Sequence, residues 1–252
     1  MLNRILKSLR APQAPQACVP PGIRIYAIGD IHGRLDLLDK LLVRIEQDDL
    51  ARGQSATQLI FLGDLVDRGP DSAGVVERLR RLAETNVNMR FLLGNHEETF
   101  LRAIEGNTKA LKFFCRYGGR ETILSYGIPP DEYDRLDYDD LAARLAPLVP
   151  SSHRDFLGRF EDLITIGDYA FVHAGVRPDM PFDSQTVHDL RWIREPFLGH
   201  RGMLDKVVVH GHTISEQVEI LPHRIGIDTG AYMSGVLSAL GLERDDRWIL
   251  ST

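Results

Sequence analysis

The sequence has little cysteine. Its 252 residues contain only Cys18 and Cys115, which lie far apart and form no CxxC motif. Such a pair provides neither a disulfide framework nor a thiolate zinc site. We therefore expect the chain to work in the reducing cytoplasm.

Long apolar runs are missing as well. No stretch reaches the roughly 18 apolar residues that a helix needs to cross a bilayer, so no transmembrane segment is predicted. The opening residues MLNRILKSLRAPQAPQ carry charges among their apolar positions and lack the unbroken apolar segment of a secretory signal. We expect residues 1–21 to form a flexible tail.

An excess of positive charge is also absent, because 30 Lys and Arg stand against 36 Asp and Glu, for a net charge of −6. Nucleic acid is therefore not expected as a main partner. The hydrophobic fraction of 43% is close to that of soluble globular proteins. A chain of this length can bury a substantial core in one large domain.

A recurring pattern begins at Gly22: a short apolar run, then a glycine or small residue, then Asp, Asn or His. It occurs in IRIYAIGD, QLIFLGD, MRFLLGN, DYAFVHAG, KVVVHGH and RIGIDTG. Such runs are typical of buried strands. Each polar cluster then follows the C-terminal end of a strand, where α/β folds place their chemistry.

Helical periodicity separates the early strands, in LDLLDKLLVRIEQ (35–47) and SAGVVERLRRLAE (72–84). Residues 98–160 contain no comparable strand, but they have helical patterning around the turn-rich SYGIPPDEYD. We predict a catalytic domain over residues 22–252 with an inserted helical cap at about 98–160.

The polar clusters provide carboxylate, amide and imidazole groups, which suit Mn²⁺, Fe or Zn²⁺. If strand geometry continues past the first apolar run, Asp30 and His32 point the same way. Six ligands exceed what one ion with an open position needs, so two metal ions are predicted. The clusters that offer such groups contain Asp30 and His32, Asp64 and Asp67, residues 95–97, His173, and His210 and His212.

Five motifs, GDIHG, GDLVDRG, GNHE, HAG and GHT, occur in this order. Together they resemble the phosphoprotein phosphatase family of calcineurin-like metallophosphoesterases, of the bacterial serine/threonine protein phosphatase type. The resemblance implies a four-layer α/β fold, a central β-sandwich flanked by helices. It also implies a monomer that hydrolyses phosphoserine and phosphothreonine in proteins or peptides, by in-line attack of a metal-bridging hydroxide.

The same resemblance assigns the metal ligands. Asp30, His32 and Asp64 would hold the first ion. Asp64, Asn95, His173 and His212 would hold the second, with Asp64 as the bridge. Mn²⁺ is the expected metal, and Fe or Zn²⁺ would suit the same ligands.

The resemblance assigns the catalytic roles too. His96 would protonate the leaving oxygen, and Asp67 would accept a hydrogen bond from the His96 ring and orient it. Arg68 would bind the phosphoryl oxygens, together with Asn95. Arg194 is the expected second arginine.

Three assignments stay open. Arg191, three residues before Arg194, could do the same work. Alternation along VVVHGH puts His210 on the same side as His212; the family motif selects His212 and leaves His210 as a supporting or substrate-facing residue. Asp228 could contact the pocket or only form a turn with the glycine that follows.

Two other functions compete with protein dephosphorylation. The ending IDTGAYMSGVLSAL also resembles bacterial hydrolases of symmetrical dinucleoside tetraphosphates; a cap that encloses two nucleosides would favour that activity. A noncatalytic phosphate-binding scaffold is the alternative of another class. It is disfavoured because every expected ligand and the acid His96 are present.

Overall fold

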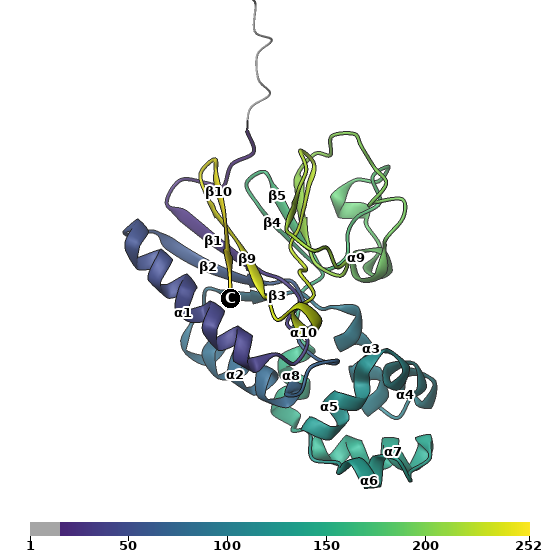
Figure 1. Cartoon of the computed structure of the whole chain (residues 1–252). Coiled ribbons are helices and arrows are strands. Elements are labelled where there is room, and N and C mark those ends of the chain that lie inside the picture. The colour runs from purple at the N-terminus through teal and green to yellow at the C-terminus, as the bar shows by residue number, and fades with distance from the viewer. Residues whose placement is uncertain (1–15) are drawn as a thin grey trace, which may run out of the picture.

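The computed structural model describes residues 16–252 and contains two five-stranded mixed sheets that pack face to face (Figure 1). The first has the order β10-β9-β1-β2-β3. Its strands are β1 (Ile23–Ile28), β2 (Ala56–Phe61), β3 (Met89–Phe91), β9 (Ser238–Glu243) and β10 (Asp246–Ser251). The second has the order β4-β5-β6-β8-β7. Its strands are β4 (Leu163–Ile166), β5 (Tyr169–Val172), β6 (Val207–His210), β7 (Glu219–Ile220) and β8 (Arg224–Gly226).

The central strands β1 and β9 of the first sheet are buried on both faces. In β1, Ile25 and Ala27 join the core between the two sheets, whereas Tyr26 and Ile28 point to the outer, helix-covered face. This alternation follows from the two-residue period of a strand. Two buried faces explain why the run is continuously apolar rather than alternating.

Helices cover the outer faces of both sheets. Helices α1 (Leu35–Arg52) and α2 (Ser72–Thr85) lie along the first sheet, and α9 (Val187–Trp192) lies on the far side of the second (Figure 1). Leu38, Leu41 and Ile45 recur along one face of α1 and are buried against the sheet. The order helix, sheet, sheet, helix confirms the predicted four-layer α/β fold.

Residues 95–157 form a group of short helices at one end of the sandwich (Figure 1). They are α3 (Asn95–Ile104), α4 (Thr108–Phe114), α5 (Arg120–Ser125), α6 (Pro130–Tyr133), α7 (Tyr138–Leu145) and α8 (Ser151–Leu157). A kink at Gly118, whose φ is 113°, separates α4 from α5. The Gly118 carbonyl accepts a hydrogen bond of 3.0 Å from the Arg68 backbone, so the helical segment contacts the polar loops directly.

Most of the predicted tail, residues 1–15, lies outside the described residues. The remaining part of it packs onto the domain: Val19 is buried, and its backbone N–H donates to the Arg244 carbonyl at 2.9 Å. The ordered domain therefore begins before the predicted boundary at residue 22. Between residues 16 and 252, no helix is both long and apolar enough to span a bilayer.

Candidate active site

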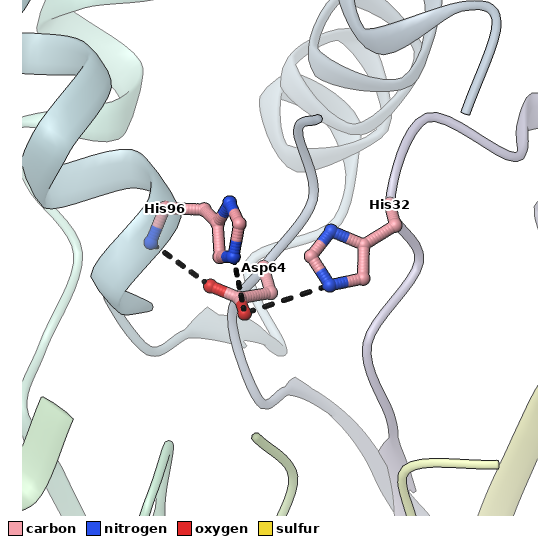
Figure 2. A group of neighbouring side chains, drawn as sticks. All are labelled: His32, Asp64 and His96. Atoms are coloured by element: carbon pink, nitrogen blue, oxygen red, sulfur yellow. Dashed lines mark hydrogen bonds and ion pairs between the residues drawn. The ribbon is translucent and has the colours of Figure 1, made fainter. Parts of the chain in front are cut away.

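The loops that follow β1, β2, β3, β5 and β6 converge, and they bring all six predicted metal ligands together in buried positions. Two groups of side chains have ligand atoms within 4.8 Å of one another: His32, Asp64 and His96, and Asp64, His173 and His212. Figure 2 shows His32 and His96 turned toward the Asp64 carboxylate. Asp64 belongs to both groups, which is the position that a bridging ligand requires.

The backbone leaves strand geometry where these loops begin. His32, Asp64, Asp67, Arg68 and His212 all have positive φ, between 45° and 75°. Non-glycine residues adopt this conformation at a cost, and such residues concentrate at functional sites. The expected alternation of Asp30 and His32 along a continuing strand is therefore wrong, because β1 ends at Ile28.

His173 and Asn95 approach each other through two atoms that both accept hydrogen bonds, so neither supplies a hydrogen to the contact. The ring Nδ1 of His173 lies 2.8 Å from the Leu62 carbonyl, which can only accept, so Nδ1 carries the hydrogen. Burial lowers the pKa of His173 to about 4, and the ring is neutral near pH 7. Its Nε2 lone pair then faces Asn95 Oδ1 at 2.9 Å. Two acceptors this close fit a shared cation.

Two further imidazole nitrogens are available to a metal. His32 donates through Nδ1 to the Val66 carbonyl at 2.7 Å, so its Nε2 carries the lone pair that could coordinate a metal; Arg68 Nη1 lies 3.0 Å from this nitrogen. The Nε2 of His212 is buried with no hydrogen-bond partner among the described residues. Burial lowers the pKa of His212 to about 2, so its ring is neutral at any physiological pH.

Three carboxylates crowd the same place. Burial, followed by the charges of Asp228 and Asp64, raises the pKa of Asp30 well above its usual value. Burial likewise raises the pKa of Asp64 to about 6. Such a cluster needs positive charge to ionise, and oxygen and imidazole ligands without thiolate suit hard or borderline divalent cations. The residues therefore fit a pair of divalent metal ions.

His96 and Asp67 form the expected contact, with 2.5 Å between His96 Nδ1 and Asp67 Oδ2. Thr122, from α5, donates to the other carboxylate oxygen at 2.7 Å and so orients Asp67. Arg68 reaches the opposite side of the ring, 3.1 Å from His96 Nε2. The sequence analysis missed Thr122 because it lies 55 positions from Asp67 in an irregular helical segment. The role of His96 as an acid stays a prediction.

Glu97 is a second residue whose role sequence reasoning missed. Its carboxylate is fully buried and accepts backbone N–H bonds of 2.7 to 3.1 Å from Asp64, Leu65, Val66 and Gly94. These contacts join the loops after β2 and β3, which carry Asp64 and Asn95. Its position in the GNHE motif could have indicated that Glu97 has a role. Only the folded loops show which backbone N–H groups its carboxylate binds.

The structure distinguishes between the two arginines. Arg191 donates to Asp162 at 2.6 Å and pairs with Glu98, so two carboxylates of the chain already neutralise its charge. Arg194 instead lines the cavity beside Asp64. Tyr232, from α10 (Ala231–Ser234), packs its ring 4.9 Å from the Arg68 guanidinium, a further contact that the sequence analysis did not predict.

The structure also resolves the environment of His210 and Asp228. His210 belongs to neither group of candidate metal ligands; its Nε2 lies 3.3 Å from Arg224 and its ring packs on Phe197. The predicted alternation with His212 fails because His212 has a φ of 62°. Asp228 forms a turn through Gly230 N–H at 2.9 Å, yet it also lies close enough to raise the pKa of Asp30.

A cavity of about 210 Å³ opens beside the candidate metal ligands. Its polar lining residues are Asp64, Asn95, His96 and His212, with Arg68 and Arg194. The rest of its lining consists of three aromatic side chains, Phe113, Tyr117 and Trp192. None of these aromatics was predicted as a site residue.

Divalent metal is expected to stabilise the protein. Adding Mn²⁺ to metal-free protein at about 100 times its dissociation constant should raise Tm by roughly 5–10 °C, because a ligand that binds only the folded state adds about 2.7 kcal/mol at that excess. Differential scanning fluorimetry of chelator-treated protein measures this shift. An unchanged Tm with Mn²⁺, Fe²⁺ and Zn²⁺ alike would contradict the metal assignment.

Comparison with known proteins places this geometry in context. The family model of calcineurin-like phosphoesterases matches residues 23–233. A symmetrical bis(5'-nucleosyl)-tetraphosphatase of Acidovorax sp. is 30% identical over 184 residues, which cover 73% of this chain and 51% of that protein. An asymmetrical bis(5'-nucleosyl)-tetraphosphatase of Anoxybacillus flavithermus is 27% identical, over 84% of this chain and 88% of that protein. The chain thus spans about half the length of the first relative and most of the second.

Solved structures agree on the fold. A crystal structure provisionally assigned as a diadenosine tetraphosphatase superposes with a TM-score of 0.63 at 24% identity, covering 94% of this chain and 98% of that one. At this identity the likeness supports the architecture alone.

Proposed function

Because the chain belongs to the calcineurin-like phosphoesterases, whose family model matches residues 23–233, we propose that it is a metal-dependent hydrolase of dinucleoside tetraphosphates. The relatives from Acidovorax and Anoxybacillus bear the names of such enzymes. This proposal takes precedence over the expected phosphoserine and phosphothreonine phosphatase, for which the family match alone provides no specific support.

The observation that carries the proposal is the aromatic part of the cavity lining. Phe113, Tyr117 and Trp192 face the same space as Asp64 and Asn95. Aromatic rings stack on nucleobases, whereas a phosphorylated serine has no flat group for them to contact. Arg68 and Arg194 lie in the same cavity, where guanidinium groups can bind phosphate oxygens in pairs.

The proposed mechanism divides the work among the chain's own residues. Asp30, His32, Asp64, Asn95, His173 and His212 would hold two divalent ions, with Mn²⁺ as the first choice. When bound, such ions supply Lewis-acid activation of water and of the phosphoryl oxygens. Arg68, Arg194 and Asn95 would orient the phosphate under attack. His96, oriented by Asp67, would deliver a proton to the leaving oxygen.

A competition between substrates tests the proposal. Purified protein with Mn²⁺ is assayed on diadenosine tetraphosphate and on a phosphothreonine peptide, and kcat/KM is compared. We expect the dinucleotide to be preferred by at least about tenfold, the effect of roughly 1.4 kcal/mol of added binding. The reverse preference would establish the protein phosphatase instead, and turnover of neither would favour the noncatalytic scaffold.

Product analysis in the same assay decides the cleavage position. Symmetrical cleavage releases two molecules of ADP, whereas asymmetrical cleavage releases AMP and ATP. Relatives with symmetrical and with asymmetrical cleavage both match this chain, so sequence similarity does not choose between the two cleavage positions. Chromatography of the products does.

A further inference from the structure

A second cavity, of about 410 Å³, adjoins the first and shares Phe113 and Trp192 with it. Its other walls include Ala110 and Lys109 from α4, Arg102 from α3 and His188 from α9. We call it the α4–α9 cavity. Its volume lies within the range of about 300–1,000 Å³ that is typical of small-molecule sites.

The aromatic groups of the α4–α9 cavity are held in place. The Trp192 indole N–H donates to Glu98 Oε2 at 2.9 Å, across 94 positions of sequence. The His188 ring lies nearly parallel to the indole, at an interplanar angle of 22° and a centroid distance of 6.2 Å. Phe113 meets Trp192 at 5.8 Å and is still 40% exposed. Trp192 is thus held in place, and the three rings together form an aromatic surface open to solvent.

Positive charge accompanies these rings. Lys109 and Arg102 both line the α4–α9 cavity, and Arg102 makes only a 3.4 Å ion pair with Glu98 while remaining largely exposed. Cations beside a flat apolar surface suit a ligand with an aromatic base and a phosphate group. Asn107, another wall residue, accepts a bond from the Ala110 backbone through Oδ1, so its amide N–H groups remain available as donors.

The first cavity is too small to hold a whole dinucleoside tetraphosphate, so part of the substrate needs a second space. At about 210 Å³, the first cavity lies below the usual range for a drug-sized ligand and already includes the predicted metal ligands. A dinucleoside tetraphosphate has two nucleosides, so at least one base must lie elsewhere. The α4–α9 cavity is reached directly past Phe113 and Trp192, which belong to both spaces.

We propose that the α4–α9 cavity binds one nucleobase of the substrate, which stacks on Trp192 and Phe113 while its phosphate chain runs into the first cavity. This inference rests on the proposed function, since it names the part of the substrate that the chain recognises outside the metal centre. Lys109 and Arg102 neutralise phosphate charge at the cavity rim.

Calorimetric titration of the Mn²⁺-loaded protein with ADP and with inorganic pyrophosphate tests the base site without relying on turnover. Base stacking should make ADP bind about 5–100-fold more tightly than pyrophosphate. Ala110→Phe fills the α4–α9 cavity without touching the first one and should abolish this advantage. Its affinity for pyrophosphate should not change.

A second cavity variant and a control variant complete the test. His188→Ala removes an exposed ring that lines only the α4–α9 cavity, so it should fold normally and reduce the ADP advantage several-fold. Tyr138→Ala is the matched control, because Tyr138 is 42% exposed on α7 and lines neither cavity. It should behave like the wild type.

The outcomes separate the base site from the proposed function. Equal affinity for ADP and pyrophosphate in the wild type, or an ADP advantage that survives both Ala110→Phe and His188→Ala, would overturn the base site even if diadenosine tetraphosphate is hydrolysed. An ADP advantage that these variants remove would support the base site even if the phosphopeptide proves the better substrate. In that case only the proposed function would fail.

Discussion

Asp64→Asn is expected to remove most of the bound metal and to lower kcat on diadenosine tetraphosphate by about 10³-fold. Asp64 Oδ2 lies 3.7 Å from His32 Nε2, and Oδ1 lies 3.4 Å from His173 Nε2, so one carboxylate faces both groups of ligands. Replacing it with an amide removes the charge that two cations would share. A catalytic metal contributes several kcal/mol to the barrier, and about 4 kcal/mol corresponds to this loss.

Elemental analysis of the purified variant, together with its turnover, measures both effects. Asp39→Asn is the matched control, because it makes the same chemical change in a half-exposed residue that pairs with Arg78 on the surface. It should keep wild-type metal content and rate. Near-normal metal content and kcat in Asp64→Asn would remove Asp64 from the centre of the site.

His96→Asn is expected to lower kcat by about 10²–10⁴-fold on substrates with a poor leaving group, as the loss of a general acid does. An alkoxide leaving from phosphothreonine needs a proton, whereas p-nitrophenolate hardly does. The loss should therefore be large for the peptide, intermediate for the dinucleotide and small for p-nitrophenyl phosphate. Steady-state kinetics on the three substrates measures this order.

The same variant decides between two roles, since His96 also lies within ligand distance of His32 and Asp64. An acid can be removed without losing metal, whereas a ligand cannot. The hydrogen bond from His96 Nδ1 to Asp67 favours the acid. His200→Asn, in the loop between α9 and β6, is a control that should change neither property. Equal rate losses on all three substrates, together with lost metal, would make His96 a ligand.

Much of the fold followed from local pattern. All six predicted strands and both predicted helices are present, because short apolar runs ended by glycine and apolar residues at helical spacing reflect local geometry. The hairpin of β9 and β10 was not predicted. Its turn contains Arg244 with a φ of 52°, a conformation that an arginine does not signal in sequence.

The sequence by itself determined which residue types end the strands, and thus the chemistry of a metal-dependent phosphoesterase. The family resemblance already favoured His212 over His210 and Arg194 over Arg191, but only the tertiary structure showed that His210 turns to Arg224 and that Arg194 lines the cavity. The tertiary structure showed as well that Glu97 joins two loops. It also brought Phe113 of α4 against Trp192 of α9. Local periodicity specifies strands and helices, but left-handed backbone turns and the packing of distant helices depend on contacts that no short segment contains.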